Sequence, residues 1–220
     1  MDDRTAIVLG ATGLTGGLLV NELLDDDRYS KIKLFSRRKG QFESPKIEEF
    51  IGDILQLEDF KGDFIGDVLF CCIGTTKAKT KDQEKYKAID YGIPLAAAKL
   101  AKQNNINTII IISAIGANAD SSVFYNRTKG EMERDVSEQK VPHSYILRPS
   151  LITGNRNEKR GLEKLGSAVF KALNFLLVGP LKKYRSIDAS VIARAMIEVD
   201  QVKPTSLIIE SDEITRFGKV

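Results

Sequence analysis

The chain has 220 residues, 42% of them hydrophobic, which is enough to bury the core of one globular domain spanning residues 1–220. Its 33 basic and 30 acidic residues give a formal net charge of +3, too small to create an electrostatic surface for nucleic acid or anionic lipid. No apolar stretch of the sequence reaches membrane-spanning length. We therefore expect no nucleic-acid partner and no membrane partner.

The N-terminus and the cysteines indicate in which cellular compartment the protein is expected. The sequence MDDRTAIVLG has charged residues and then a short apolar run, which is typical of a strand and not of a signal peptide. Cys71 and Cys72 are neighbours in an apolar run, so in a strand their side chains point to opposite faces. This arrangement predicts neither a disulfide framework nor a metal site. The sequence indicates a cytoplasmic protein with no bound metal.

Apolar, β-branched runs recur along the chain and predict strands. The predicted strands are Thr5–Gly10, Lys31–Ser36, Lys46–Ile51, Asp67–Gly74, Asn107–Ser113, His143–Pro149 and Ser206–Glu210. Helical periodicity between them predicts helices at Leu14–Asp26, Asp82–Gln103, Val123–Gln139 and Asp188–Asp200.

Two residues mark expected helix boundaries. Asp188 is a candidate N-cap, and Pro94 is expected to end or kink the helix that contains it. The alternation of strands and helices predicts an α/β fold: a Rossmann-like, doubly wound parallel sheet of about seven strands with helices on both faces. The periodicity weakens over residues 154–186, where we expect a small substrate-facing lobe.

The first predicted strand runs into the turn GATGLTG and then into a helix. In this context glycines permit a tight turn, close approach of the backbone to a pyrophosphate and close packing of helix on strand. The free N–H groups at the helix N-terminus can bind the phosphates. The turn therefore predicts a dinucleotide site. Its predicted contacts are Gly10, Thr12, Gly13, Leu14, Thr15 and Gly16.

The end of the second predicted strand bears on which dinucleotide binds. A carboxylate about 20 residues past the glycines would bind the ribose 2′-hydroxyl of NAD(H). The sequence there is FSRRKG, with Ser36, Arg37 and Arg38. Two guanidinium groups beside a hydroxyl suit a 2′-phosphate. We therefore predict NADP(H), preferred over NAD(H).

The third and fourth predicted strands end in further candidate contacts, since ligands of open α/β sheets bind at the carboxyl ends of strands. Asp53, followed by Ile54, could accept a hydrogen bond from the adenine amino group. At the end of the fourth strand Gly74 allows the backbone to pass close to a cofactor, and the hydroxyl of Thr75 follows it. The predicted contacts of this second loop are Cys72, Ile73, Gly74 and Thr75.

The stretch SSVFYNRTKGEME contains Tyr125 and Lys129, four residues apart and so on one face of the predicted helix. Such a pair is also common on ordinary surface helices. Ser113, which closes the fifth predicted strand, precedes Tyr125 by twelve residues. Together with the glycine turn upstream, these residues predict a reactive group.

The motifs GATGLTG, GD at Gly52 and Asp53, CCIGTT, YNRTK and RPSLITG occur in the order of the short-chain dehydrogenase/reductases. The chain resembles their extended or atypical branch. More closely, FSRRK, FCCIGTTKAK and YNRTKGEMERDV are similar to the NAD(P)H-binding proteins related to the HIV Tat-interacting protein. The resemblance covers nearly the whole chain.

The resemblance implies roles for the reactive group. Tyr125 would pass a proton during hydride transfer between nicotinamide and a carbonyl or alcohol carbon. Lys129 would stabilise the phenolate and bind the nicotinamide ribose, and Ser113 would hydrogen-bond the substrate oxygen. Arg148 and Pro149 would lie at the nicotinamide end of the cofactor.

One residue departs from the family pattern. Asp90 stands nearest to the position at which many members carry Asn, and a carboxylate cannot donate as an amide does. The sequence thus leaves two main hypotheses open, with an epimerase or dehydratase that uses transient oxidation as a third. The first is an NADPH-dependent reductase of a small carbonyl compound. The second is an NADP(H)-binding regulator with a protein partner and little turnover. Either would be a monomer or a homodimer.

Overall fold

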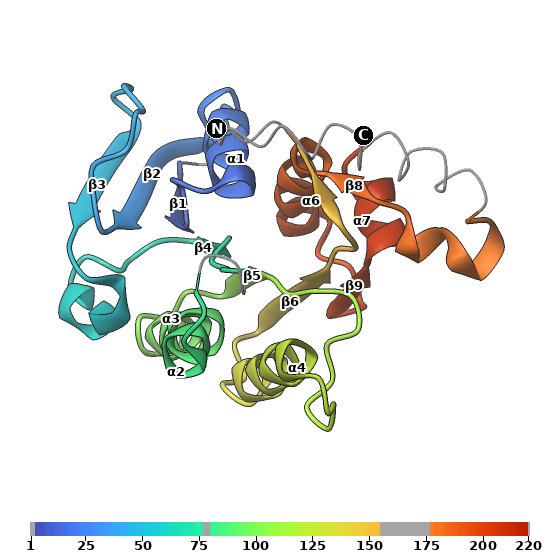
Figure 1. Cartoon of the computed structure of the whole chain (residues 1–220). Coiled ribbons are helices and arrows are strands. Elements are labelled where there is room, and N and C mark those ends of the chain that lie inside the picture. Colours follow the sequence, from blue (N-terminus) through green and yellow to red (C-terminus); the bar gives the residue numbers. More distant parts are fainter. Residues whose placement is uncertain (1–2, 77–79, 155–176, 220) are drawn as a thin grey trace.

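The computed structural model describes residues 3–76, 80–154 and 177–219 (Figure 1). Most of the predicted substrate-facing lobe, residues 155–176, lies outside the described residues.

A seven-stranded sheet with the strand order β3-β2-β1-β4-β5-β6-β9 forms the centre of the molecule, and every neighbouring pair is parallel. The predicted Rossmann-like, doubly wound fold is confirmed, and each strand overlaps one of the seven predicted runs. The strands are β1 (Arg4–Leu9), β2 (Tyr29–Ser36), β3 (Ile47–Ile51), β4 (Val68–Cys71), β5 (Thr108–Ile112), β6 (His143–Arg148) and β9 (Ile208–Glu210).

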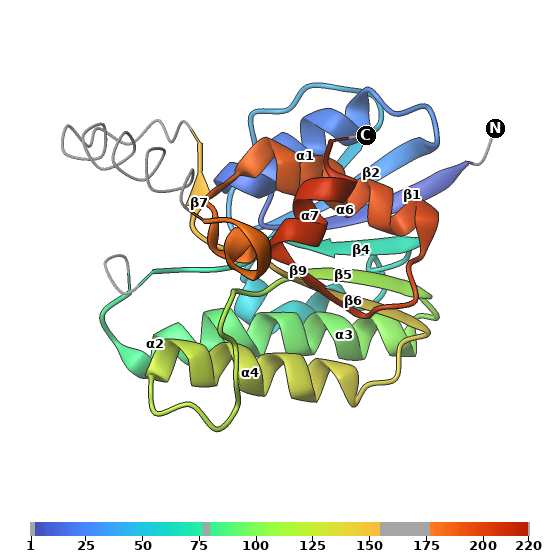
Figure 2. The same cartoon turned by 90° about the vertical axis from the view of Figure 1, so that its right-hand side faces the viewer.

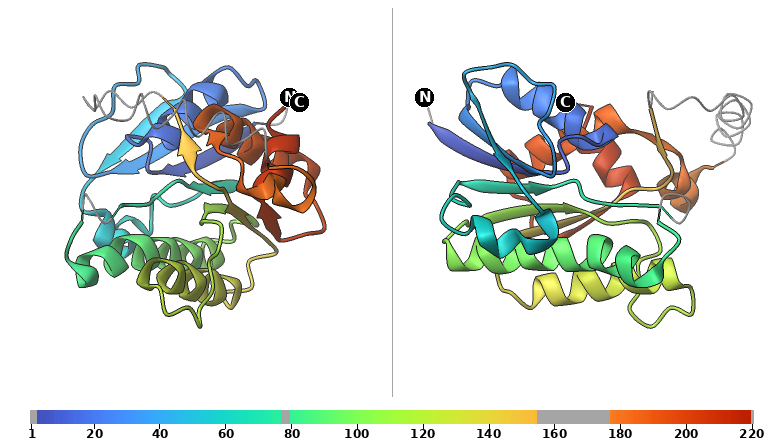
Figure 3. Two further views of the ribbon diagram at one scale, coloured as in Figure 1. Left: turned by 45° about the vertical axis from the view of Figure 1, so that its right-hand side comes forward. Right: turned by 60° about the vertical axis from the view of Figure 1, so that its left-hand side comes forward.

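Helices cover both faces of the sheet (Figures 1 and 2). One layer contains α1 (Leu14–Leu24), α6 (Ala189–Val202) and α7 (Ser211–Phe217). The opposite layer contains the 3₁₀ segment η1 (Ile54–Phe60), α2 (Gln83–Lys87), α3 (Ile93–Gln103) and α4 (Phe124–Ser137). The two views in Figure 3 show the sheet between these layers.

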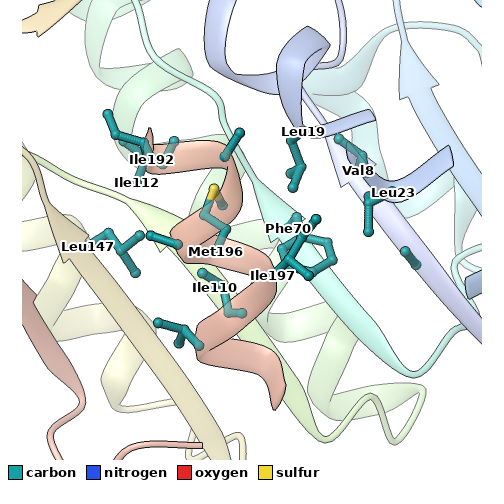
Figure 4. Packing of buried hydrophobic residues seen from close by; sticks show 14 of the residues in the cluster. Val8, Leu19, Leu23, Phe70, Ile110, Ile112, Leu147, Ile192, Met196 and Ile197 are labelled. Atoms are coloured by element: carbon teal, nitrogen blue, oxygen red, sulfur yellow. The ribbon is translucent and has the colours of Figure 1, made fainter. Parts of the chain in front are cut away.

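The strand residues alternate between two hydrophobic cores, one under each helical layer. In β5, Ile110 and Ile112 pack in the core beneath α6, whereas Ile109 and Ile111 pack in the core beneath α3 and α4. Figure 4 shows the first core around Met196 of α6. Because β5 is buried on both faces, its uniformly apolar sequence is the one expected of a central parallel strand.

The strand order reverses between the parallel neighbours β1 and β4: from β1 the chain continues to β2 and β3 on one side, and from β4 to β5 and β6 on the other. At such a switch point the loops after the two strands diverge and leave a crevice at the carboxyl edge of the sheet. In Figure 2 this edge is at the end of the molecule where α2 lies, opposite the N-terminus.

The helix expected over Asp82–Gln103 forms without a break, but it contains a π-helical turn between two α-helical segments. A π-helical turn, η2 (Ala88–Gly92), separates α2 from α3, and the N–H of Ile93 donates to the carbonyl of Ala88. Pro94 lies in the first turn of α3 and has no N–H to donate. Pro94 therefore does not end the helix, and the change of winding lies just before it.

Several short elements have no counterpart in the sequence-based prediction. Besides α7 and η1, they are β7 (Ile152–Thr153), β8 (Ile187–Asp188) and the 3₁₀ segment η3 (Gly179–Tyr184). The strands β7 and β8 pair in parallel and form a second, two-stranded sheet. Asp188 caps α6 by accepting from the N–H of Ser190 at 2.9 Å, as predicted.

A buried ion pair stabilises the opposite, amino edge of the sheet. Arg4 at the start of β1 contacts Asp200 of α6 at 2.5 Å, and the hydroxyl of Tyr29 at the start of β2 donates to the same carboxylate at 2.6 Å. This cluster joins α6 to two strands at the end of the molecule remote from the glycine turn. Among the described helices, none is long and apolar enough to cross a membrane.

Candidate functional site

The glycine turn after β1 passes against the end of β4. Gly10 has a φ of +88°, and a Cβ on it would lie 2.8 Å from the carbonyl oxygen of Cys72. A Cβ on Gly16 would lie 2.2 Å from the carbonyl oxygen of Gly10. Only glycine satisfies both the backbone conformation at residue 10 and the close approach of α1 to the turn at residue 16.

The N-terminus of α1 faces the crevice without a side-chain cap among the described residues. Gly13 is the N-cap, and its own N–H donates to the carbonyl of Gly10 at 2.9 Å. Thr12 is exposed in the turn, while Leu14 and Thr15 begin the helix. An uncapped helix terminus and a backbone cradle without Cβ atoms fit a pyrophosphate, which would accept from the free N–H groups.

The loop after β2 is shaped by Ser36. Its side chain is buried, and its hydroxyl donates to the carbonyl of Arg38 at 2.6 Å. Glu49 accepts from the N–H of Gly40 at 2.7 Å and closes the loop further along. Arg37 and Arg38 are both exposed, so their guanidinium groups are free to meet an anionic group at this edge.

Asp53, after β3, has a local structural role. Its carboxylate accepts from the N–H of Leu55 at 3.0 Å and caps η1, of which Ile54 is the first, buried residue. The adenine contact predicted for Asp53 stays a prediction that uses the remaining acceptor capacity of the carboxylate.

The two cysteines at the end of β4 point to opposite faces, as predicted. Cys71 packs in the core beneath α3, and burial raises the pKa of its thiol to about 11. Cys72 packs against the other core, with its Sγ 3.7 Å from Sδ of Met196. Both are free, so in this structure the contribution of the CCIGTT motif to the crevice comes from its backbone and from Thr75.

Tyr125, Lys129 and Asp90 come together beside this loop. Lys129 is buried, and its Nζ lies 3.1 Å from Oδ1 of Asp90, which is also buried. The other carboxylate oxygen of Asp90 accepts from the N–H of Thr75 at 2.8 Å. Tyr125, one turn before Lys129 on α4, is 40% exposed. The group therefore presents a phenol to solvent, with an ion pair below it.

The charges around Tyr125 set its acidity in opposite directions. Partial burial raises the pKa of the phenol, the Lys129 ammonium lowers it, and the Asp90 carboxylate raises it again, with a net upward shift. Tyr86 of α2 packs edge-on against the Tyr125 ring with the centroids 6.5 Å apart. Tyr125 thus carries its proton at neutral pH.

The structure does not bring the hydroxyl of Ser113 into this group. Ser113 is buried, and its Oγ donates to Oε1 of Glu133 at 2.5 Å. Glu133 lies eight residues beyond Tyr125 on α4, roughly 12 Å along the helix axis. The hydrogen bond to Glu133 is thus the contact that the structure records for this hydroxyl, and the substrate contact predicted for Ser113 stays a prediction.

Arg148 belongs to the same network as Ser113. Its guanidinium donates to both oxygens of Glu133, with Nη2 2.5 Å from Oε2, and also lies 3.4 Å from Glu210. The adjacent Pro149 accepts from the N–H of Ile115 at 2.9 Å. In this structure these contacts connect α4 to β5, β6 and β9, and the contacts of Arg148 and Pro149 with a cofactor remain predictions.

Sequence reasoning missed Glu133, although a signal for it was present. Tyr125, Lys129 and Glu133 are spaced i, i+4, i+8 and lie on one stripe of α4. The buried residues Met132 and Val136 interleave with this stripe and mark it as facing the sheet. A polar stripe on an inward helix face needs partners, which the structure supplies in Asp90, Ser113 and Arg148.

The described residues contain no group of three or more His, Cys, Asp or Glu side chains that could hold a metal ion. What the site can hold is a phosphate at the glycine turn, an anionic group beside the loop after β2 and a reacting carbonyl or alcohol at Tyr125.

Comparison with known proteins gives the family. A family described as NAD(P)H-binding matches residues 10–172. The chain is 34% identical over 211 residues to the protein FMP52, mitochondrial, of Lodderomyces elongisporus, covering 89% of this chain and 86% of that protein. It is 31% identical to FMP52, mitochondrial, of Candida albicans (97% and 98% covered) and 33% identical to HTATIP2 of Rattus norvegicus (100% and 91% covered).

Solved structures confirm the fold. The enzyme WbmH of Bordetella bronchiseptica, in complex with NAD⁺, superposes with a TM-score of 0.69 at 14% identity, covering 93% of this chain and 74% of that one. A UDP-N-acetylglucosamine 4-epimerase of Methanobrevibacter ruminantium has a TM-score of 0.69 at 16% identity, with 95% and 76% covered.

The relatives also correct one prediction. The FMP52 proteins are named mitochondrial, so the predicted cytoplasmic location is wrong. That prediction rested on the lack of a signal peptide. A secretory signal distinguishes exported proteins from retained ones and does not separate cytoplasm from mitochondrion.

Proposed function

The chain belongs to the NAD(P)H-binding family, and we propose that it is an NADPH-dependent oxidoreductase that reduces a small carbonyl compound, with Tyr125 as the proton donor. One observation carries the proposal. A phenol that is 40% exposed lies one helical turn from a buried ammonium group, beside the loop that follows β4 at the switch point of the sheet. This is where a doubly wound fold binds its ligand.

The preference for NADPH rests on the loop after β2. Ser36 fixes the loop by donating to the carbonyl of Arg38, and the guanidinium groups of Arg37 and Arg38 are exposed at its tip. Arginine binds a phosphate through paired, charge-assisted hydrogen bonds. The loop FSRRKG contains no carboxylate that would bind a ribose 2′-hydroxyl instead.

The chain's own residues then divide the work of reduction. When bound, the cofactor supplies a hydride for the carbonyl carbon. Tyr125 donates its phenolic hydrogen bond to the carbonyl oxygen and transfers the proton as negative charge develops there. Lys129 stabilises the phenolate that remains, because its ammonium favours the charged form of the phenol.

Ser113 has a supporting part in this proposal. Its hydroxyl is donated to Glu133, so it would have to break a short, buried hydrogen bond before it could orient a substrate. We assign the polarisation of the carbonyl oxygen to Tyr125 and the seating of α4 on β5 to Ser113.

The hydrogen bond between Ser113 and Glu133 favours a second candidate function, an NADP(H)-binding regulator with little turnover and a protein partner. A site in which Ser113 is held by Glu133 lacks the hydroxyl that the short-chain dehydrogenase/reductase pattern assigns to the substrate oxygen. Cofactor binding would be the same in both functions, whereas turnover would differ.

Cofactor titration tests the first half of the proposal. We expect NADPH to bind wild type more tightly than NADH by isothermal calorimetry, and the double variant Arg37→Ala, Arg38→Ala to lose most of that preference. Arg216→Ala, which removes an exposed arginine 74% accessible at its side chain on α7, is the matched control and should bind as wild type does. Equal or tighter binding of NADH by wild type would refute the assignment.

A panel of small aldehydes and ketones tests the second half. Oxidation of NADPH, followed at 340 nm, should accompany at least one of them and should be lost in Tyr125→Phe. Tight NADPH binding with no turnover on any compound would favour the regulator.

A further inference from the structure

Asp90 is a buried carboxylate that the proposed reaction does not itself use. It lies in the π-helical turn η2, and its side chain has almost no exposed surface. A π-helical turn inside an α-helix is uncommon and is found frequently at functional sites. Here the turn directs a charged side chain inwards between the loop after β4 and helix α4.

The contacts of Asp90 join two parts of the site. Oδ2 accepts from the N–H of Thr75 at 2.8 Å, and Oδ1 lies 3.1 Å from Nζ of Lys129. The same loop is held from the other side by Tyr86, whose hydroxyl donates to the carbonyl of Thr75 at 3.3 Å. Tyr86 in turn packs against Tyr125. The loop, the ammonium and the phenol are thus held in one connected group.

Because Asp90 is buried, its negative charge interacts strongly with the neighbouring charged groups. Lys129 and Asp90 are both shielded from water, so their interaction is screened less than that of a surface pair. A negative charge beside the ammonium offsets the positive field that Lys129 exerts on Tyr125. An uncharged amide side chain at residue 90 would not offset the effect of the Lys129 charge on Tyr125.

We propose that Asp90 is a positioning residue: it ties Lys129 to the loop after β4 and offsets the charge that the ammonium exerts on Tyr125. This inference deepens the proposed function, on which its meaning for catalysis rests. In the proposed reduction Asp90 fixes where Lys129 and the loop after β4 stand relative to Tyr125, while the phenol carries its proton at neutral pH with or without the carboxylate.

The groups that act on Tyr125 are few in the described part of the chain. Lys129 faces it from its own helix, Asp90 from η2 and Tyr86 from α2. Of the two charged groups, the ammonium lowers and the carboxylate raises the pKa of Tyr125. Removing the carboxylate charge should therefore lower that pKa.

Asp90→Asn tests the proposal without cofactor or substrate. Tyrosine labelled with ¹³C at Cζ reports the phenolate directly by NMR, and the signal of Tyr125 is assigned by its absence in Tyr125→Phe. We expect Asp90→Asn to shift the titration of Tyr125 downwards by about one pH unit. The matched control, Asp135→Asn, removes another carboxylate of the contact between α4 and η2, where Asp135 accepts from Tyr91, and should leave Tyr125 unchanged because Asp135 is not among the charges that act on it.

The outcomes separate the inference from the proposed function. The signal of the buried Tyr29 reports whether each variant is folded, and if Asp90→Asn fails to fold, Asp90→Glu, which keeps the charge, should fold and titrate within about 0.3 unit of wild type. An unchanged or raised titration of Tyr125 in folded Asp90→Asn would overturn the inference. Absence of turnover would count against the proposed function alone, because the titration is measured on the free protein.

Discussion

The network around Glu133 predicts that Ser113 stabilises the fold. Ser113→Ala removes the hydroxyl that donates to the buried carboxylate of Glu133 at 2.5 Å. A hydrogen bond to a charged group contributes about 1.5 to 3 kcal/mol, and the arginine partner of Glu133 stays in place. We therefore expect the free energy of unfolding to fall by about 2 kcal/mol, or the Tm by about 4 to 8 °C for a chain of this size.

Urea denaturation followed by circular dichroism measures this change. Ser137→Ala is the matched control, since Ser137 also donates to Glu133 from within α4, but to its neutral backbone carbonyl at 2.7 Å. That bond should contribute only about 1 kcal/mol. The pair Ser113→Ala and Glu133→Gln should also be non-additive by roughly 1 kcal/mol, because the first removes the contact and the second removes the charge that strengthens it.

The alternative role for Ser113 makes a different prediction. Loss of a donor to a substrate oxygen typically lowers kcat by about 10² to 10³. Unchanged stability in Ser113→Ala, together with a loss of that size on any substrate found, would refute the structural role and restore Ser113 to the reaction.

Three further results are expected. Gly10→Ala should abolish NADPH binding in calorimetry because its Cβ would clash with the backbone of Cys72, whereas Gly62→Ala, which has no neighbour within 4 Å, should bind normally. Asp200→Ala should reduce the free energy of unfolding in urea by about 3 kcal/mol, since it leaves a partly buried arginine unpaired, yet leave NADPH affinity unchanged at the remote site. Cys71, buried and with a pKa of about 11, stays protonated at pH 8 and should react with iodoacetamide, read by mass spectrometry, only after unfolding; rapid labelling of the folded protein would contradict its placement.

The sequence predicted the regular elements because their patterns are local. Each of the seven apolar runs became a strand of the sheet, and Pro94 marked the change of winding before α3. The short helix α7 was missed although Glu210 and Glu213 form its capping box, because the prediction treated Glu210 only as the end of a strand. The strands β7 and β8 are two residues long, too short for any alternation to be read.

The candidate site was predicted in part. What the sequence did not predict is which residue of α4 the side chain of Ser113 contacts. The spacing of Tyr125 and Lys129 placed them on one face of a helix, as the structure has them. The alternation of β5 sends Ile109, Ile111 and then Ser113 towards α4. Which residue of α4 would meet Ser113 depends on how far the helix extends along the sheet, and this is a tertiary property that no local pattern contains.

The steady-state rate of NADPH oxidation in wild type and in Tyr125→Phe tests the central claim most directly. Tyr91→Phe, which removes the hydroxyl that donates from η2 to Asp135 of α4, is the matched control. On a carbonyl substrate that wild type reduces, the account predicts a loss in kcat of about 10² to 10⁴ for Tyr125→Phe, with NADPH affinity retained, and a wild-type rate for Tyr91→Phe. Full activity in Tyr125→Phe would contradict the account.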